Sequence, residues 1–199
     1  NNSVKREVII RLMYGFELID TRQAVNYAQK VLLFDKIDNW LLSKAEIIIS
    51  RNDFESGNYV KARKSYRRIL NIDKNSDGAE AMYMLIYLTY LDDSLDIVEE
   101  MIFDMPNNFS DNYYIAKSFI LLSDIYVSRG DKFQAKATLE SILDNYDGEE
   151  LILLAKKKRE DIIESEIKEE ITVEKIRYID IFEEELEYEL YDVADTLRK

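Results

Sequence analysis

The chain of 199 residues contains no cysteine and no histidine. Without cysteine it has no disulfide bonds, no thiolate catalysis and no cysteine-ligated metal site. The lack of histidine excludes Ser-His-Asp catalysis, the usual zinc hydrolase sites and histidine pH switches. An enzyme built on this sequence would have to rely on Asp, Glu, Lys, Tyr or Ser, so we predict a non-enzymatic protein without a cofactor or metal.

Turn-forming residues are also scarce, because the chain has five glycines and a single proline, Pro106. A sandwich or barrel with many tight turns is therefore not expected, and the composition favours helices. No apolar run reaches the roughly 18 uncharged residues that cross a bilayer, so we predict no transmembrane segment. The chain opens on Asn1 without the basic and apolar stretches of a secretory leader, which leads us to expect a mature or excised piece.

Charge is distributed unevenly along the chain. The formal net charge is −13, and residues 160–195 hold fifteen acidic residues against three basic ones. Such a surface repels a phosphate backbone, so no nucleic-acid partner is predicted. The one basic run, Lys156 to Arg159, is interpreted as a solvated helix end, and an import or anion-binding motif is the alternative.

Apolar residues recur at helical spacing along most of the chain, and the breaks are short and polar. The expected helices span residues 3–19, 21–35, 38–56, 58–71, 78–91, 93–104, 112–129, 131–146 and 149–168. Loops this short make consecutive helices antiparallel neighbours, so the predicted fold class is all-α.

Residues 116–146 show the clearest internal pattern, as two helices joined by Arg129-Gly130-Asp131. Offsets of 0, 3, 4 and 7 on the first helix, and of 0, 4 and 7 on the second, form one stripe each. The first stripe is Phe119, Leu122, Ser123 and Tyr126, and the second is Ala135, Leu139 and Ile142. Small residues suit close helix contacts, and large residues fill the wider gaps.

This stretch resembles the tetratricopeptide repeat, whose pattern is a large aromatic residue, Leu-Gly, Tyr, Ala, a large apolar residue and Pro. Ser123 replaces the Gly, and Asp147 stands where Pro often follows. The resemblance implies a right-handed α–α superhelix, with about four irregular helix pairs over residues 1–148 and a capping helix over 149–168. Residues 1–165 also look like the C-terminal part of long repeat proteins of Bacteroides-type bacteria, and that likeness alone implies a periplasmic or envelope-associated location.

The repeat is less regular elsewhere, and its register in residues 78–106 stays open. Ser94, Val98, Met101 and Pro106 fit the motif but imply a shortened turn, whereas alignment on Ile97 keeps the turn length and loses the small residue. With Ser94, the small positions Ala24, Ala62, Ser94 and Ala135 are 38, 32 and 41 residues apart. These spacings scatter around the roughly 34 residues of the repeat.

Residues 169–199 form an acidic amphipathic tail. Steps of 3 and 4 place Ile179, Phe182, Leu186, Leu190, Val193 and Leu197 on one stripe. This predicts a helix, although two short pieces also alternate as a strand would. An apolar stripe needs a cover, so possible self-association through residues 170–199, against another copy or the chain's own groove, is the alternative function.

Two further patterns receive structural interpretations. Asp73, Asn75, Asp77 and Gly78 imitate the start of a calcium-binding loop, but Met84 stands where a bidentate Glu belongs, so we interpret the segment as a turn and helix start. Of the fourteen tyrosines, we expect most to be packed in the core. Tyrosines such as Tyr113 and Tyr114 are candidates for a recognition surface.

The site prediction comes from the family resemblance. In tetratricopeptide repeats the first helix of each pair lines the concave face, with exposed residues offset by 3, 4 and 3. In this chain those positions are Lys44, Ile47, Arg51 and Phe54 in one unit, and Lys117, Ile120, Asp124 and Val127 in another. Such a mixed strip suits a protein partner's peptide or helix. The predicted function is a protein–protein interaction scaffold, with an enzyme that works without His and Cys as the least favoured alternative.

Overall fold

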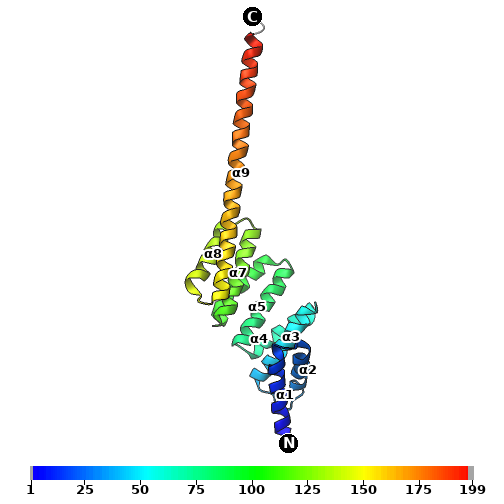
Figure 1. The fold of residues 1–199 in the computed structure, drawn as a ribbon. Helices are drawn as coiled ribbons and strands as arrows, with labels where there is room; N and C mark the ends of the chain where they lie inside the picture. Colours follow the sequence, from blue (N-terminus) through cyan, green and yellow to red (C-terminus); the bar gives the residue numbers. More distant parts are fainter. Residues whose placement is uncertain (1, 197–199) are drawn as a thin grey trace.

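The computed structural model describes the backbone of residues 2–196 and the side chains of residues 3–183, 186 and 187. This part of the chain consists of nine α-helices and contains no strand, which confirms the all-α prediction (Figure 1). The helices are α1 (Asn2–Glu17), α2 (Thr21–Val31), α3 (Asn39–Glu55), α4 (Tyr59–Ile72), α5 (Ser76–Leu91), α6 (Leu95–Asn108), α7 (Asn112–Ser128), α8 (Lys132–Asn145) and α9 (Glu149–Thr196).

The first eight helices form four pairs, and three residues separate the two helices of every pair. In three of these turns the middle residue has a left-handed backbone, with φ of 76° at Gly57, 58° at Asp93 and 77° at Gly130. The amide of each middle residue bonds a carbonyl three residues back, and the next amide bonds a carbonyl five residues back. This is the usual closure of a helix by a left-handed residue, so the three turns are structural equivalents.

These turns settle the repeat register that the sequence left open. Ala24, Ala62 and Val98 lie at the same distance from their turns as Ala135 does from its own. The four positions follow one another along the chain at spacings of 38, 36 and 37 residues. Val98 is fully buried, whereas Ser94 precedes α6 and Ile97 is 55% exposed. Both expected registers were therefore wrong. The turn has the same length as in the other pairs, Asp93 takes the position of the turn glycine, and Val98 takes the position of the small residue at the close helix contact.

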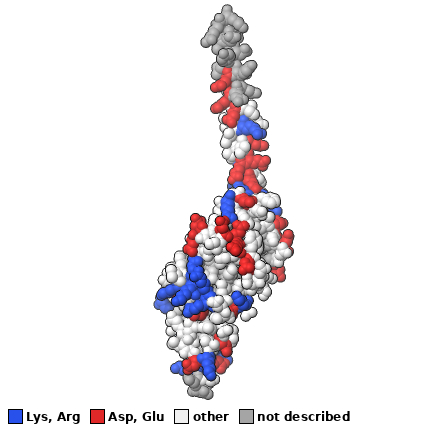
Figure 2. All heavy atoms as spheres, turned by 180° about the vertical axis from the view of Figure 1, so that it is seen from behind, with Lys and Arg blue, Asp and Glu red and all other residues white. Residues whose placement is uncertain are grey.

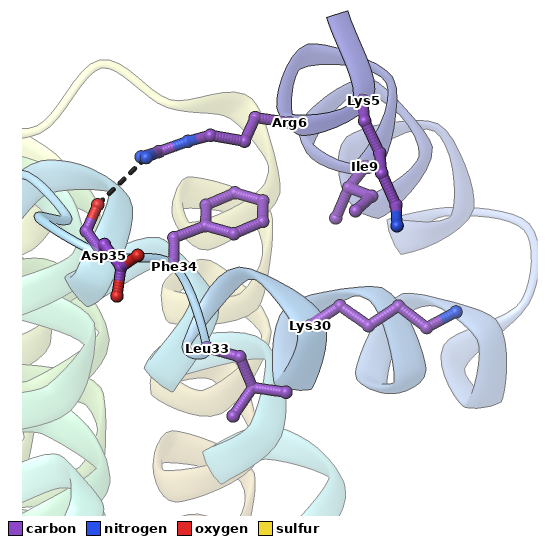
Figure 3. Close-up of a pocket in the computed structure, with 7 residues that line it drawn as sticks. All are labelled: Lys5, Arg6, Ile9, Lys30, Leu33, Phe34 and Asp35. Carbon is purple, nitrogen blue, oxygen red and sulfur yellow. Dashed lines mark hydrogen bonds between the residues drawn. The ribbon is translucent and has the colours of Figure 1, made fainter. Parts of the chain in front are cut away.

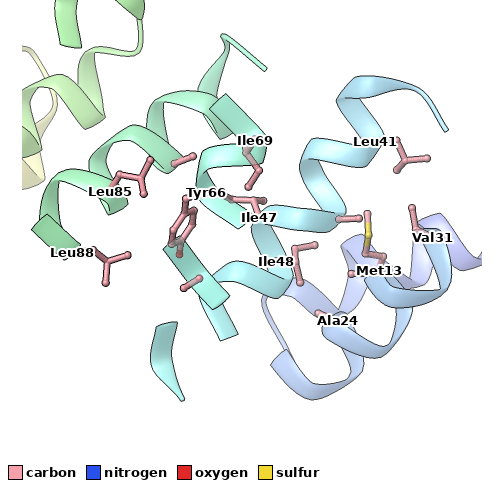
Figure 4. Packing of buried hydrophobic residues seen from close by; sticks show 14 residues of the cluster. Met13, Ala24, Val31, Leu41, Ile47, Ile48, Tyr66, Ile69, Leu85 and Leu88 are labelled. Atoms are coloured by element: carbon pink, nitrogen blue, oxygen red, sulfur yellow. The ribbon is translucent and has the colours of Figure 1, made fainter. Parts of the chain in front are cut away.

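The pairs stack into a superhelix with an inner and an outer side. Each second helix packs against its own first helix and the next one, and α5 also contacts the first helices α3 and α7. The inner face is therefore built from first helices, as in a helical-repeat solenoid. The core comprises three clusters of buried residues, which partly buried side chains such as Leu70 and Phe119 connect. Figure 4 shows its N-terminal part, where Met13, Ile47, Tyr66 and Ile69 from α1, α3 and α4 are fully buried.

One continuous helix, α9, covers both the expected capping helix and the tail. Its first part packs on α7 and α8 and buries Leu151, Ala155 and Ile162, so it occupies the place of the first helix of a fifth pair. From Lys168 onward every described side chain is exposed, and Figure 1 shows the helix projecting away from the repeats. The side chains of Leu190 and Val193, and all of Leu197, lie outside the described residues.

Ion pairs fasten the docked part of α9. Lys132 and Lys136 of α8 bond Glu169 and Glu166, and Arg159 bonds Glu140 of α8, each at 2.6 Å. The basic run of residues 156–159 therefore lies inside a long helix instead of at a helix end, and its second half is paired with neighbouring helices. No helix among the described residues combines the length and the apolarity that a membrane crossing requires.

The segment that imitates a calcium loop is the turn between α4 and α5. The Asp73 side chain accepts a hydrogen bond from the Asn75 amide at 2.6 Å, which closes the turn. A Cβ at Gly78 would lie 2.3 Å from the Asp73 carbonyl oxygen. Gly78 is thus needed for a close backbone approach, in agreement with the turn interpretation.

Candidate interaction surface

The inner face carries a chain of hydrogen-bonded polar side chains from four successive first helices. Glu17 of α1 accepts bonds from Lys44 Nζ at 2.9 Å and from Arg51 Nη1 at 2.7 Å, both of α3. The Arg51 guanidinium also donates from Nε and Nη2 to both carboxylate oxygens of Glu80 on α5. Tyr114 of α7 donates its hydroxyl proton to Glu80 at 2.7 Å. This polar chain ties the four repeats together along the inner side.

Burial and charge act together on Glu17 within this chain. Burial by itself would raise the Glu17 pKa, but the hydrogen bonds and charges of Lys44 and Arg51 outweigh it and hold the pKa below the ordinary 4.5. The Glu80 side chain is 8% exposed, so its charge depends on Arg51 for compensation. Lys44 and Arg51 therefore serve the packing of the repeats as well as lining the inner face.

The structure places Ile47 and Ile120 in the core, although the sequence pattern assigned them to the concave face. Ile47 is fully buried between α3 and its neighbours, and Ile120 is 5% exposed. Ile47 belongs to the core cluster built from α1 to α5, and Ile120 to the cluster that α7 and α8 form with α9. A partner could reach neither of them without separating the repeats.

The other predicted residues lie at the surface. Lys117 Nζ lies 4.8 Å from the ring centre of Tyr83 and 5.6 Å from that of Tyr113. Asp124 accepts a bond from Lys158 of α9 at 2.6 Å, so the docked helix engages that carboxylate. Phe54 is half-buried, and Val127 is exposed at the end of α7.

A strip of aromatic side chains crosses the inner face, and the sequence analysis missed half of it. Phe54 contacts Tyr87 at a ring distance of 6.0 Å, and Tyr87 lies 6.1 Å from Tyr90 and 6.4 Å from Tyr83. Tyr83 continues to Tyr114 at 6.0 Å, and Tyr114 to Tyr113 at 5.1 Å. We call these six residues the aromatic strip. All are half-buried, so each exposes part of its ring.

The sequence contains the pattern that predicts this strip, but the pattern is recognised only when the repeat register of residues 78–106 is known. Once Asp93 is placed in the glycine position, the offsets used for the other units fall on Glu80, Tyr83, Tyr87 and Tyr90 of α5. The expectation for Tyr113 and Tyr114 pointed to the same surface. Burial raises the pKa of Tyr83 to about 12, so its hydroxyl stays neutral at physiological pH. The strip therefore offers aromatic area and hydroxyl groups.

A separate hollow of about 620 Å³ lies at the N-terminal end, between α1 and the end of α2 (Figure 3). Arg6 spans it and donates to the backbone carbonyls of Asp35 at 2.9 Å and Lys36 at 3.3 Å. Its guanidinium also lies 4.6 Å from the ring centre of Phe34. These contacts of Arg6 tie α1 to the loop that leads into α3.

Comparison with known proteins supports the fold alone. No protein-family model matches the sequence, and no curated protein matches it significantly. A solved structure described as MamA protein superposes with a TM-score of 0.52 at 19% identity, covering 80% of this chain and 86% of that one. A second MamA structure gives a TM-score of 0.48 at 20% identity, covering 75% and 91%.

The first of these similarities, together with the stacked pairs, confirms the predicted right-handed, tetratricopeptide-like superhelix. It does not extend to the resemblance to long Bacteroides-type proteins. The chain is thus similar to MamA in fold, at an identity too low to carry a partner or a site.

Proposed function

We propose that the chain is a non-enzymatic interaction scaffold that binds a peptide or helix of a partner protein along its inner face. The observation that carries this proposal is the aromatic strip, which spans three successive repeats and keeps its rings partly exposed. Tyrosine combines a large contact area with a polar tip and loses little entropy on binding, so it is common at recognition surfaces.

The charges beside the strip indicate the chemistry of the partner. Lys44, Arg51 and Asp124 are already bound to residues of this chain, whereas Lys117 lies over two tyrosine rings. Lys117 can therefore receive a carboxylate from outside without breaking an ion pair seen among the described residues. The partner segment that fits best carries apolar side chains for the aromatic strip and one acidic residue near α7.

A peptide selection tests this function. Peptides are selected from a displayed random library on the immobilised chain, and their affinities are measured for Tyr87→Ser and Lys117→Glu variants. Each substitution should weaken binding about tenfold or more, since each removes a central contact. Phe133→Ser is the matched control, because Phe133 of α8 is 76% exposed and lies outside the aromatic strip. Equal binding to all four proteins would refute the inner-face site.

A catalytic role has less support. The inner-face carboxylates of Glu17, Glu80 and Asp124 are all paired with cations of this chain. An acid–base mechanism would need one of them to be released. The scaffold function accounts for the same residues without such a step.

The projecting part of α9 favours a second function, self-association. Ile171, Tyr178 and Phe182 are between 48% and 75% exposed, on the part of α9 that Figure 1 shows projecting away from the repeats. An exposed apolar face of this length marks an interaction site more often than a solvated surface. We propose that this segment binds another copy. The chain's own groove is a less suitable receptor, since α9 leads away from it.

A further inference from the structure

Most large apolar side chains of the projecting segment of α9 lie on one side of the helix, while Val173 and Ile176 lie outside that side, and its charged residues are mostly acidic. At 100° per residue, Ile167, Ile171, Tyr178, Ile179, Phe182 and Leu186 all face the same side of the helix, and each is at least 44% exposed. Residues 169–187 contain eight acidic residues and two basic ones. Glu174 and Glu183 flank the apolar side, one on each edge, and one basic residue, Lys175, lies within it. The complementary surface should be apolar in the middle and basic at its edges.

This composition argues against pairing of two such segments. Side-by-side α9 helices would cover their apolar faces, but would also bring two strongly acidic helices within a few ångströms of each other. Like charges along a helix interface are destabilising and select against that partner. A basic surface removes this repulsion and adds attraction, so charge complementarity favours a different receptor.

The outer face of α4 has the required properties. Helix α4 carries five basic residues and no acidic one, namely Lys61, Arg63, Lys64, Arg67 and Arg68. A hollow of about 640 Å³ lies along it, and Tyr59 and Val60, which are 46% and 86% exposed, form its apolar part. Four of the five basic residues line the same hollow. Figure 2 shows a dense cluster of Lys and Arg on the repeat body, well separated from the acidic projecting helix.

Several of these cations are not engaged within the described part of the chain. Arg63 pairs with Asp92 at 2.6 Å and Arg68 with Glu46 at 2.8 Å. Among the described residues, Lys61, Lys64 and Arg67 contact no carboxylate within ion-pair distance. They are therefore available to acidic groups of another molecule.

The receptor cannot be the α4 of the same molecule while α9 stays straight. The helix has 48 residues, a length of about 72 Å, and it leads away from the repeats without a break. A second copy does not have this restriction. Donor and receptor surfaces are then different on each molecule, so the contact is head-to-tail and can repeat along a chain of molecules.

We propose that the acidic segment 167–187 of one molecule docks its apolar side on Tyr59 and Val60 of a second molecule, with its flanking carboxylates on the basic residues of α4. The proposal rests on the self-association proposed for α9 and adds the identity of the receptor surface. Because the contact combines apolar burial with ion pairs at a rim, its strength decreases with salt.

A charge-swap experiment on the full chain tests the receptor. Lys64→Glu/Arg67→Glu lowers the formal charge of α4 from +5 to +1, and Glu174→Lys/Glu183→Lys changes that of residues 169–187 from −6 to −2. Sedimentation of nuclease-treated protein should show concentration-dependent association of the native chain that weakens about tenfold or more between about 0.15 M and 0.5 M salt. Each variant alone should sediment as a monomer, whereas an equimolar mixture of both should associate again, since every contact then joins opposite charges.

The controls separate the two levels of the proposal. Lys5→Glu/Lys30→Glu makes the same charge change at the N-terminal end and should associate like the native chain. Phe182→Asp should abolish association. If Phe182→Asp still associates, or if the native chain is monomeric at every concentration, the role of α9 itself is refuted. If Phe182→Asp abolishes association but the α4 variant still associates, only the receptor is wrong and pairing between α9 segments replaces it. Association that is lost on nuclease treatment would instead assign α4 to nucleic acid and overturn the proposal.

Discussion

Arg51 binds both carboxylate oxygens of Glu80 through Nε and Nη2, along one edge of its guanidinium, and thereby joins the second and third repeats across the inner face. The pair is asymmetric, because the Glu80 side chain is 8% exposed and that of Arg51 is 35% exposed. The same arginine reaches Glu17 of the first repeat. Arg51, which the sequence analysis expected to contact a partner, therefore also holds three repeats in register.

Removal of Arg51 should destabilise the fold because it leaves the Glu80 carboxylate buried without its cation. We expect Arg51→Gln to lower the free energy of unfolding in urea by about 2–3 kcal/mol. Arg51→Gln combined with Glu80→Gln should recover part of that loss, since no uncompensated charge remains. Arg11→Gln, which breaks the exposed pair with Glu7, should change stability by less than about 0.5 kcal/mol. Equal losses for Arg11→Gln and Arg51→Gln would contradict this account.

Two glycines should respond to alanine in opposite directions. Gly57 has φ of 76°, and a Cβ at this position would meet no atom within 4 Å, so its requirement is one of backbone conformation alone. Gly57→Ala should cost about 1 kcal/mol, while Gly15→Ala within α1 should stabilise by a similar amount. Thermal and urea unfolding of both variants check the signs. Stabilisation by Gly57→Ala would show that the turn is not left-handed in solution.

Glu17 should make stability depend on pH in the acid range. Its pKa in the folded chain lies below the ordinary 4.5, so its contribution is present above that value and disappears as pH falls through the folded pKa. Asp77, whose pKa burial raises, contributes with the opposite sign. The difference in unfolding free energy between the native chain and Glu17→Gln should therefore favour the native chain at pH 7 and shrink toward about pH 3. A constant difference across that range would show that Glu17 is not held by Lys44 and Arg51.

The docked part of α9 should behave as a structural element of the repeats. Leu151 is 2% exposed and Leu153 is 57% exposed, so the two leucines form a matched pair on one helix. Leu151→Ala should cost about 3 kcal/mol because it opens a cavity against α7 and α8, and Leu153→Ala should cost less than about 0.5 kcal/mol. Urea denaturation measures both. Similar small losses would mean that α9 does not cap the stack.

Helix content and the boundaries of most helices could be predicted from local properties of the sequence. Few turn breakers, the 3.6-residue spacing of apolar residues and the Gly57 and Gly130 turns are all contained within short segments. The 78–106 unit failed because its turn uses Asp93 instead of glycine and its close-contact position uses Val98 instead of alanine. Asp tolerates a left-handed backbone, and the stack leaves space for a valine there, but neither fact is visible in a local pattern.

On the inner face, too, some features follow from local sequence and others only from contacts between repeats. Sequence offsets brought Lys44, Arg51, Phe54 and Lys117 to one surface, and also included Ile47 and Ile120, which the structure buries. The burial of Ile47 and Ile120 depends on contacts with neighbouring helices, including second helices such as α4 and α8, which local spacing does not show. The Arg51–Glu80 pair and the aromatic strip likewise join residues of different repeats.

The sequence by itself determined an all-helical chain of repeated pairs, and an acidic, amphipathic C-terminal region, because periodicity and charge are properties of consecutive residues. Only the tertiary structure decided which residues are exposed on the inner face, that the cap and tail form one projecting helix, and that a basic face on α4 remains open. Those outcomes depend on which helices cover one another, and that is decided by contacts between residues about 30 positions apart along the chain.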